Sequence, residues 1–247
     1  MKIRNILLGT AIALGFSSAA NAGLITTIDD FSTDQGPITV MQGESLFSSV
    51  LGNMIGGERD LMITSHVDDF NQGASVNVAG GNFFFSSGSG NESMFTIQWD
   101  GVDNSMDVNP FGLGGFDFLN AGSNSVVSFV TAIVESDLNA WFDITFWSGP
   151  QGTAETVELP IPGVDFPGRD AFFTTTEFSN TDFSDIGAIQ VRGNIVSPDT
   201  GLMVRSYDLQ LDGVTAVPEP APIALLGAGL LGIGLMQRRR KAKTSEC

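Results

Sequence analysis

The segment FTIQWD, at residues 95–100, alternates apolar and polar side chains at every step. Successive side chains of a β-strand point to opposite faces, so this segment predicts a strand with one apolar face and one polar face. Residues 142–146 and 207–212 repeat the alternation, and Gly, Asn, Asp, Ser and Pro separate many short runs of this kind. The pattern predicts a chain built of β-strands.

Two further segments refine this prediction. Residues 126–134 are apolar on both faces, which predicts a central strand that is buried on each side. Residues 44–51 carry a weak helical signal, and we expect a turn or two of helix there. Together these features predict an all-β fold, a single antiparallel β-sandwich of the jelly-roll type, over residues 23–216.

The N-terminus has the layout of a secretory signal peptide. Residues 1–22 contain a basic start with Lys2 and Arg4, an apolar run over residues 6–16, and the small-residue sequence Ala-Asn-Ala at the end. The apolar run is too short to span a bilayer, which disfavours a membrane anchor. We therefore expect export through the Sec translocon and a mature protein that begins at Gly23.

The region from residue 23 to residue 216 is strongly acidic. It contains 26 Asp and Glu residues, four Arg residues and no Lys, which gives a net charge of −22. Clustered Lys and Arg are needed to neutralise phosphate groups, so this composition excludes a nucleic-acid partner. The same surface attracts cations.

The sequence offers no arrangement typical of a catalytic site. Its one histidine, His66, directly follows Ser65, and neighbours on a strand point to opposite faces, so the two side chains do not meet. The sole cysteine is Cys247, and one histidine without cysteine in the body excludes a zinc site with the usual ligands. We predict that the protein is not an enzyme. A secreted polysaccharide hydrolase that uses a carboxylate pair is the alternative.

Calcium needs only oxygen ligands, and two pairs of Asp residues are candidates for a structural calcium site. Asp29 and Asp30 lie in the first predicted strand, and Asp208 and Asp212 lie in the last. The first and last strands of a sandwich are often neighbours, which brings these carboxylates together. The acidic loop at residues 100–107 fails the EF-hand pattern, and turn formation by Asp and Asn explains it equally well.

Two tryptophans flank the alternating segment 142–146. Trp141 and Trp147 have the opposite parity to its apolar residues, so they share the face that points away from the core. A pair of exposed indole rings among polar groups stacks on sugar rings, which makes both residues candidates for carbohydrate contact. Packing in the core or in a corner of the sandwich is the alternative.

The C-terminal segment VPEPAPIALLGAGLLGIGLMQRRRK occupies residues 217–241. Its apolar run, residues 221–236, spans about 24 Å as a helix, against about 30 Å of bilayer hydrocarbon. A basic tail at 238–243 follows the run and favours a cytoplasmic C-terminus. The basic residues next to the run are Arg238, Arg239, Arg240 and Lys241. We therefore expect one short transmembrane helix that stops the exported chain in the inner membrane.

Over residues 217–243, the tail resembles the PEP-CTERM sorting signal of Gram-negative bacteria. The resemblance rests on Val217, Pro218, Glu219 and Pro220, on the short apolar run and on the basic cluster. In that family, the Pro-Glu-Pro tripeptide is recognised by a membrane protease, exosortase. The resemblance implies that exosortase processes this chain and that an inner-membrane intermediate passes to the cell surface or the extracellular matrix. Such proteins are associated with bacteria that make exopolysaccharide and biofilm.

Three short motifs in the body are similar to galactose-binding-like jelly rolls, such as family-11 carbohydrate-binding modules. The motifs are IDDF at 28–31, GAIQVRG at 187–193 and YDLQLD at 207–212. This similarity implies a β-jelly roll with a structural calcium ion.

The leading hypothesis is an exported surface or matrix protein without catalytic activity, sorted by exosortase, that binds exopolysaccharide. The polysaccharide hydrolase is one alternative. A structural or adhesive matrix protein without a defined ligand is the other.

Overall fold

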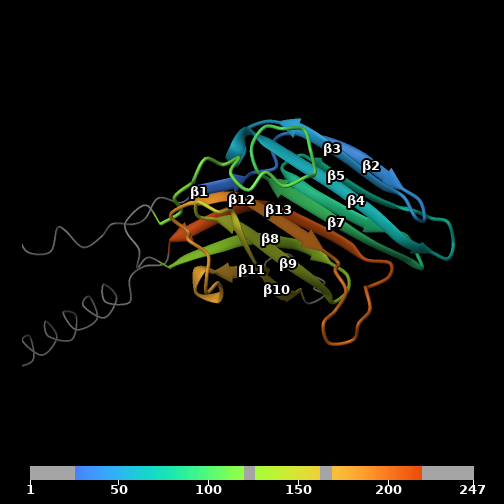
Figure 1. Ribbon diagram of the computed structural model, residues 1–247. Coiled ribbons are helices and arrows are strands. Elements are labelled where there is room, and N and C mark those ends of the chain that lie inside the picture. The colour runs from blue at the N-terminus through green and yellow to red at the C-terminus, as the bar shows by residue number, and fades with distance from the viewer. Residues whose placement is uncertain (1–25, 120–125, 162–168, 219–247) are drawn as a thin grey trace, which may run out of the picture.

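The computed structural model describes residues 26–119, 126–161 and 169–218 (Figure 1). Within these residues, thirteen β-strands form two antiparallel sheets that pack face to face. Consecutive strands repeatedly cross from one sheet to the other, as in a jelly roll. The sandwich confirms the fold class that the alternating segments predict.

Each sheet combines strands that lie far apart in the sequence. The seven-stranded sheet contains β11 (Arg169–Thr174), β8 (Val127–Ser136), β13 (Asp208–Pro218), β6 (Asn82–Ser87), β5 (Ala74–Ala79) and β2 (Gln35–Val40) in this order, and β1 (Thr26–Asp29) also pairs with β13. The six-stranded sheet contains β10 (Thr153–Ile161), β9 (Ala140–Ser148), β12 (Ile186–Gly193), β7 (Asn91–Trp99), β4 (Glu58–Asp68) and β3 (Ser45–Leu51). Two short 3₁₀ turns are η1 (Ile55–Gly57) and η2 (Thr175–Glu177).

The core between the two sheets is rich in phenylalanine. Residues 95–99 of the segment FTIQWD form the end of β7, and its three apolar side chains are all buried. Phe95 of this segment packs against Phe83 of the other sheet, with ring centroids 4.7 Å apart. Phe129 and Phe146 join the sheets in the same way at 4.8 Å. A slip of one residue would turn such rings outward, so the alternation fixes the register of each strand.

A buried ion pair lies within the sandwich. Arg59 of β4 points inward, and its Nη1 lies 3.0 Å from Oδ2 of Asp29 in β1. Its Nε donates to Gln35 Oε1 at 2.8 Å, and its Nη2 donates to the carbonyl of Thr33 at 2.6 Å. Trp99 Nε1 donates to the same Asp29 oxygen at 3.0 Å. Each charged group therefore has several partners, as a buried charge requires.

One local prediction is wrong, because residues 44–51 do not form a helix. β3 pairs with β4 at every position from Ser45 to Leu51. Helix propensities of ordinary residues differ by only about 0.7 kcal/mol per residue, so a continuous ladder with a neighbouring strand outweighs a weak local preference. The central position predicted for residues 126–134 is confirmed, since β8 lies between β11 and β13, but burial on each side is not, because Val130 and Thr131 are only half-buried.

β13 continues into the segment that the sequence assigns to the sorting signal. Val217 and Pro218 are its last two residues and pair with Ser128 and Val127 of β8. The other predictions for the two ends of the chain lie outside the described residues; they are the signal peptide at 1–22, Glu219 and Pro220, the apolar run at 221–236 and the basic tail at 238–243. Across residues 26–119, 126–161 and 169–218, no helix is long and apolar enough to cross a membrane.

Candidate functional site

A row of polar side chains crosses all six strands on the outward face of the six-stranded sheet. The strand register aligns one residue from each strand along this row. From β10 to β3, the aligned residues are Thr156, Thr145, Gln190, Gln98, Asp60 and Ser49, and we call them the polar row. Aligned side chains of antiparallel strands share one face, so all six point away from the core.

Hydrogen bonds connect neighbours within the polar row. The Oγ1 atoms of Thr156 and Thr145 lie 2.8 Å apart, and Gln190 Nε2 donates to Gln98 Oε1 at 2.7 Å. Thr145 and Gln98 are buried although they face outward. The row is therefore held in place before any ligand arrives.

A second aligned set of side chains lies beside the polar row. Arg192 pairs with Asp143 through two hydrogen bonds, from Nε at 3.0 Å and from Nη2. On the other side of Arg192 lies Thr96, which is only 2% exposed and whose Oγ1 has no hydrogen-bond partner among the described residues. A buried hydroxyl without a partner costs about 1–3 kcal/mol. The buried Thr96 hydroxyl is therefore a locally unfavourable feature of this face.

Trp141 and Trp147 lie on this same outward face, toward the two ends of β9. The apolar residues between them, Phe142, Ile144 and Phe146, are buried in the core, which confirms the predicted orientation of the strand. Both tryptophans are half-buried and do not belong to the hydrophobic core. Six residues of extended chain separate them by about 20 Å. The face thus offers two indole surfaces with the polar row between them.

Four carboxylates, which we call the acidic cluster, gather where β4 begins and β7 ends. They belong to Glu58, Asp60, Asp100 and Asp103. One carboxylate oxygen from each of Glu58, Asp60 and Asp103 lies within 4.8 Å of the other two. Burial raises the pKa of Asp60 to about 7, and the charges of Glu58 and Asp100 add to the shift. Burial also raises the pKa of Asp100 to about 6.

The loop after β7 folds back over this end of the sheet. The backbone N–H of Asn104 donates to Glu58 Oε1 at 2.6 Å, and that of Asn109 donates to Asp100 Oδ2 at 2.6 Å. The loop passes so close that a Cβ on Gly112 would lie 1.4 Å from the carbonyl oxygen of Asp100. Only glycine fits there, which fixes the path of the loop beside the acidic cluster.

The four Asp residues predicted to bind calcium do not form one cluster. β1 pairs with β13, as expected for the first and last strands. Asp29, Asp30 and Asp212 line one hollow of about 330 Å³, but the Asp29 carboxylate is bonded to Arg59 in the core. Asp208 lies about 13 Å from Asp212 along β13. Among the described residues, three acidic side chains with converging oxygens occur in the acidic cluster instead.

Among the described residues, the single histidine, His66, does not form a nucleophile–base pair with its neighbour Ser65. His66 is exposed in β4, whereas the Ser65 hydroxyl is buried and hydrogen bonds to Asn91 at 3.3 Å. The two side chains point to opposite sides of the strand, as their adjacency predicts.

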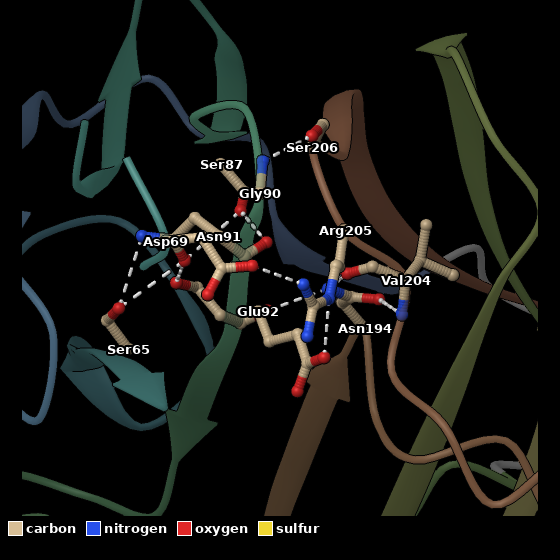
Figure 2. A network of polar contacts seen from close by, with 11 residues as sticks. Ser65, Asp69, Ser87, Gly90, Asn91, Glu92, Asn194, Val204, Arg205 and Ser206 are labelled. Atoms are coloured by element: carbon tan, nitrogen blue, oxygen red, sulfur yellow. Dashed lines mark hydrogen bonds and ion pairs between the residues drawn. The ribbon is translucent and has the colours of Figure 1, made fainter. Parts of the chain in front are cut away.

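A separate polar network ties the other end of β7 to the loop before β13 (Figure 2). Asn91 is fully buried, and its side-chain amide donates to the Ser65 hydroxyl at 3.2 Å. Arg205 lies between two carboxylates in Figure 2, with Nη1 2.6 Å from Asp69 Oδ2 and Nε 2.7 Å from Glu92 Oε1. Because these groups satisfy one another, we assign the network to the stability of the fold.

The alignment of residues between neighbouring strands of the six-stranded sheet was not predicted from the sequence. Taken one at a time in the sequence, Gln98, Gln190, Glu58 and Asp60 match no binding or catalytic motif. The polar face of FTIQWD was the available signal, because it places three polar side chains side by side on an outward face. Their partners on β4 and β12 become visible only when the strands are aligned.

The fold and its outward face define a β-sandwich of the jelly-roll class that presents a polar sheet face between two tryptophans. The C-terminal segment of the chain is identified separately: residues 216–241 match the PEP-CTERM protein-sorting motif. The match confirms the resemblance of the tail and marks the chain as an exported protein that exosortase sorts to the cell surface. No curated protein matches the chain by sequence.

Several carbohydrate-binding modules are similar to the chain in structure. A variant of a family 29 module, complexed with mannohexaose, shares 10% identity at a TM-score of 0.30, covering 70% of this chain and 91% of the module. The family 11 module from Clostridium thermocellum, in complex with a β-1,3-1,4-mixed-linked tetrasaccharide, shares 11% identity at a TM-score of 0.27, covering 78% and 95%. An exo-β-agarase shares 11% identity at a TM-score of 0.38, covering 79% of this chain and 25% of the agarase. At these values the ligand of this chain has to be argued from its own residues.

Proposed function

We propose that the exported sandwich binds a polysaccharide through the outward face of its six-stranded sheet. The observation that carries this proposal is the polar row, with Trp141 and Trp147 on either side of it. Indole faces stack on the apolar faces of sugar rings, while hydroxyl and amide side chains bond to sugar hydroxyls. A separation of about 20 Å between the tryptophans suits an extended polysaccharide rather than a single sugar.

The hydrogen-bonding groups of this face support the proposal. Gln190 is half-exposed at the middle of the polar row, and Thr156 at its β10 end is exposed. Thr145 and Gln98 are held by hydrogen bonds within the row. A face whose side chains are already ordered loses little conformational entropy when it binds.

The charge of the domain favours an uncharged ligand. Residues 23–216 have a net charge of −22. The Arg192 guanidinium on the outward face of the six-stranded sheet is ion-paired with Asp143. Glu158 adds an exposed carboxylate next to this pair. Anionic polysaccharides would be repelled, so we propose a neutral polysaccharide of the cell surface or matrix as the ligand.

The end of β13 fits delivery by the sorting motif. Because the strand reaches Pro218, the folded sandwich extends to the Pro-Glu-Pro tripeptide. Cleavage near this tripeptide would release the sandwich with almost no residues left beyond β13. We propose that the domain meets its ligand, the exopolysaccharide, at the surface where exosortase sorting leaves it.

Affinity electrophoresis of the full chain in mild detergent tests the proposal. We expect gels that contain neutral polysaccharides to retard the chain, and gels that contain acidic ones to leave its mobility unchanged. Replacing Trp147 or Trp141 by Ala should weaken binding at least about tenfold, because such anchors typically contribute more than about 1.4 kcal/mol. Phe70→Ala is the matched control, since Phe70 is an aromatic residue that is 66% exposed in the turn after β4.

Each other outcome decides between the alternatives. Retardation that survives both Trp→Ala changes, in chains with an unchanged unfolding midpoint, rejects this face as the binding site. Absence of retardation in every gel favours a structural matrix protein. Release of reducing sugar from the gel polysaccharide favours the hydrolase.

A further inference from the structure

The acidic cluster is a concentration of negative charge without a positive partner. Among the described residues, neither Arg192 nor Arg205 contacts it, because each is paired with other carboxylates. Arg59 is adjacent to two of its members in sequence, but its side chain points to the opposite face, where it binds Asp29. The charge of the cluster is therefore not compensated by the described part of the protein.

The sheet register and the loop after β7 create the cluster. Asp60 of β4 is aligned with Gln98 of β7. Because the strands are antiparallel, Glu58 at the start of β4 lies opposite Asp100, the residue that follows β7, and both side chains are on the same face. The loop then returns over the sheet and brings Asp103 to within 4.8 Å of Glu58 and Asp60. Residues from two strands and one loop thus converge on one point.

Two buried carboxylate oxygens in this cluster lack a hydrogen-bond partner within the described residues. Asp60 and Asp100 are both 0% exposed, yet Oδ2 of Asp60 and Oδ1 of Asp100 are unpaired. Their other oxygens are bonded, to the hydroxyl of Ser49 and to the Asn109 N–H respectively. A buried polar atom without a hydrogen-bond partner costs about 1–3 kcal/mol, and more when the group is charged. These oxygens are therefore suited to a cation.

We propose that Glu58, Asp60, Asp100 and Asp103 bind a calcium ion. All four supply oxygen, which is the ligand of hard divalent cations. Oxygens on opposite sides of Ca²⁺ lie about 4.6–5.2 Å apart, and those around Mg²⁺ lie about 4.0–4.2 Å apart. The oxygens of Glu58, Asp60 and Asp103 all lie within 4.8 Å of one another, which is compatible with the spacing around Ca²⁺.

The exposed member of the cluster gives the ion access to the site. Asp103 lies at the surface, whereas Glu58, Asp60 and Asp100 are buried behind it. Water completes the coordination on the open side. Extracellular calcium modules with such partly open sites bind with dissociation constants of about 10⁻⁴–10⁻³ M. The site differs from the pairs of Asp residues predicted in the first and last strands, and it does not depend on sugar binding.

Calcium titration of the full chain in mild detergent tests this inference. After removal of metal with a chelator, addition of CaCl₂ to about ten times the dissociation constant stabilises the fold by about 1.4 kcal/mol and should raise Tm by about 3–6 °C. Asp103→Asn should abolish the rise, and because Asp103 is exposed this change leaves the core intact. Asp60→Asn should have the same effect. Asp107→Asn is the matched control, since Asp107 is exposed in the same loop but outside the converging group.

Four results would overturn the inference. A Tm that does not respond to CaCl₂ in the unchanged chain rejects a calcium site. A response that persists in Asp103→Asn and Asp60→Asn rejects these ligands. A response that is lost in Asp30→Asn instead places the ion beside β1. An equal rise with MgCl₂ at the same concentration rejects calcium as the preferred ion.

Discussion

Replacing Arg59 by methionine tests the buried ion pair that ties β1, β2, β4 and β7 together. Methionine keeps an apolar stem but loses the hydrogen bonds to Asp29, Gln35 and Thr33. Asp29 is then left ionised in the core with the Trp99 Nε1 and one backbone N–H as partners. Breaking a buried pair in this way costs about 3–5 kcal/mol. We therefore expect a loss of about 4 kcal/mol in the free energy of unfolding.

Urea unfolding followed by tryptophan fluorescence measures this loss. For a chain of this size, m is about 1–3 kcal/mol/M, so the midpoint should fall by at least about 1 M. Arg205→Met is the matched control, because its guanidinium is 46% exposed and forms its two ion pairs, with Asp69 and Glu92, at the surface. An exposed pair contributes less than about 1 kcal/mol.

The double variant Arg59→Met with Asp29→Asn separates the charge from the lost packing. An uncharged amide at position 29 has no charge to bury, so the double variant should be more stable than Arg59→Met alone. If Arg59→Met unfolds at the same urea concentration as Arg205→Met, the buried pair does not tie the strands together.

Two further predictions concern pH and the network of Figure 2. Burial alone would raise the pKa of Glu155, but hydrogen bonds from Thr181 and Ser179 outweigh it and lower the pKa to about 2. Because the pKa in the folded protein lies below the ordinary glutamate value of 4.5, the stabilisation is present above pH 4.5 and is lost as the pH falls toward 2. Glu155→Gln should therefore cost about 1 kcal/mol at pH 7 and nothing measurable at pH 2, and equal costs in thermal melts at both pH values would contradict the assignment. Asn91→Ala should cost about 2–3 kcal/mol in urea unfolding, since it leaves the buried Ser65 hydroxyl without its amide partner, and a cost near zero would show that the network is dispensable.

The parity of side chains predicts most of the fold. FTIQWD and the segment 142–146 place their apolar residues in the core because the strand period of two is visible in one strand alone. The failure at residues 44–51 has a different cause. Pairing of β3 with β4 decides that segment, and the partner strand is not visible in the local sequence.

For the candidate sites too, the local sequence predicts which face a side chain is on, but not which residues of other strands lie beside it. Parity places Trp141 and Trp147 on an outward face, and composition indicates that a cation is attracted to the body. Which carboxylates converge depends on the alignment of β4 with β7 and on the path of a loop that Gly112 permits. Asp29 could not be recognised as the partner of Arg59, because the two lie 30 positions apart and meet only when the sheets close.

Intact mass spectrometry of the protein recovered from the surface of its host cells tests the central claim most directly. We expect a polypeptide that begins at Gly23 and ends near the Pro-Glu-Pro tripeptide at 218–220, without the apolar run and the basic tail. Recovery at the surface of a polypeptide that still ends at Cys247 would contradict delivery by exosortase.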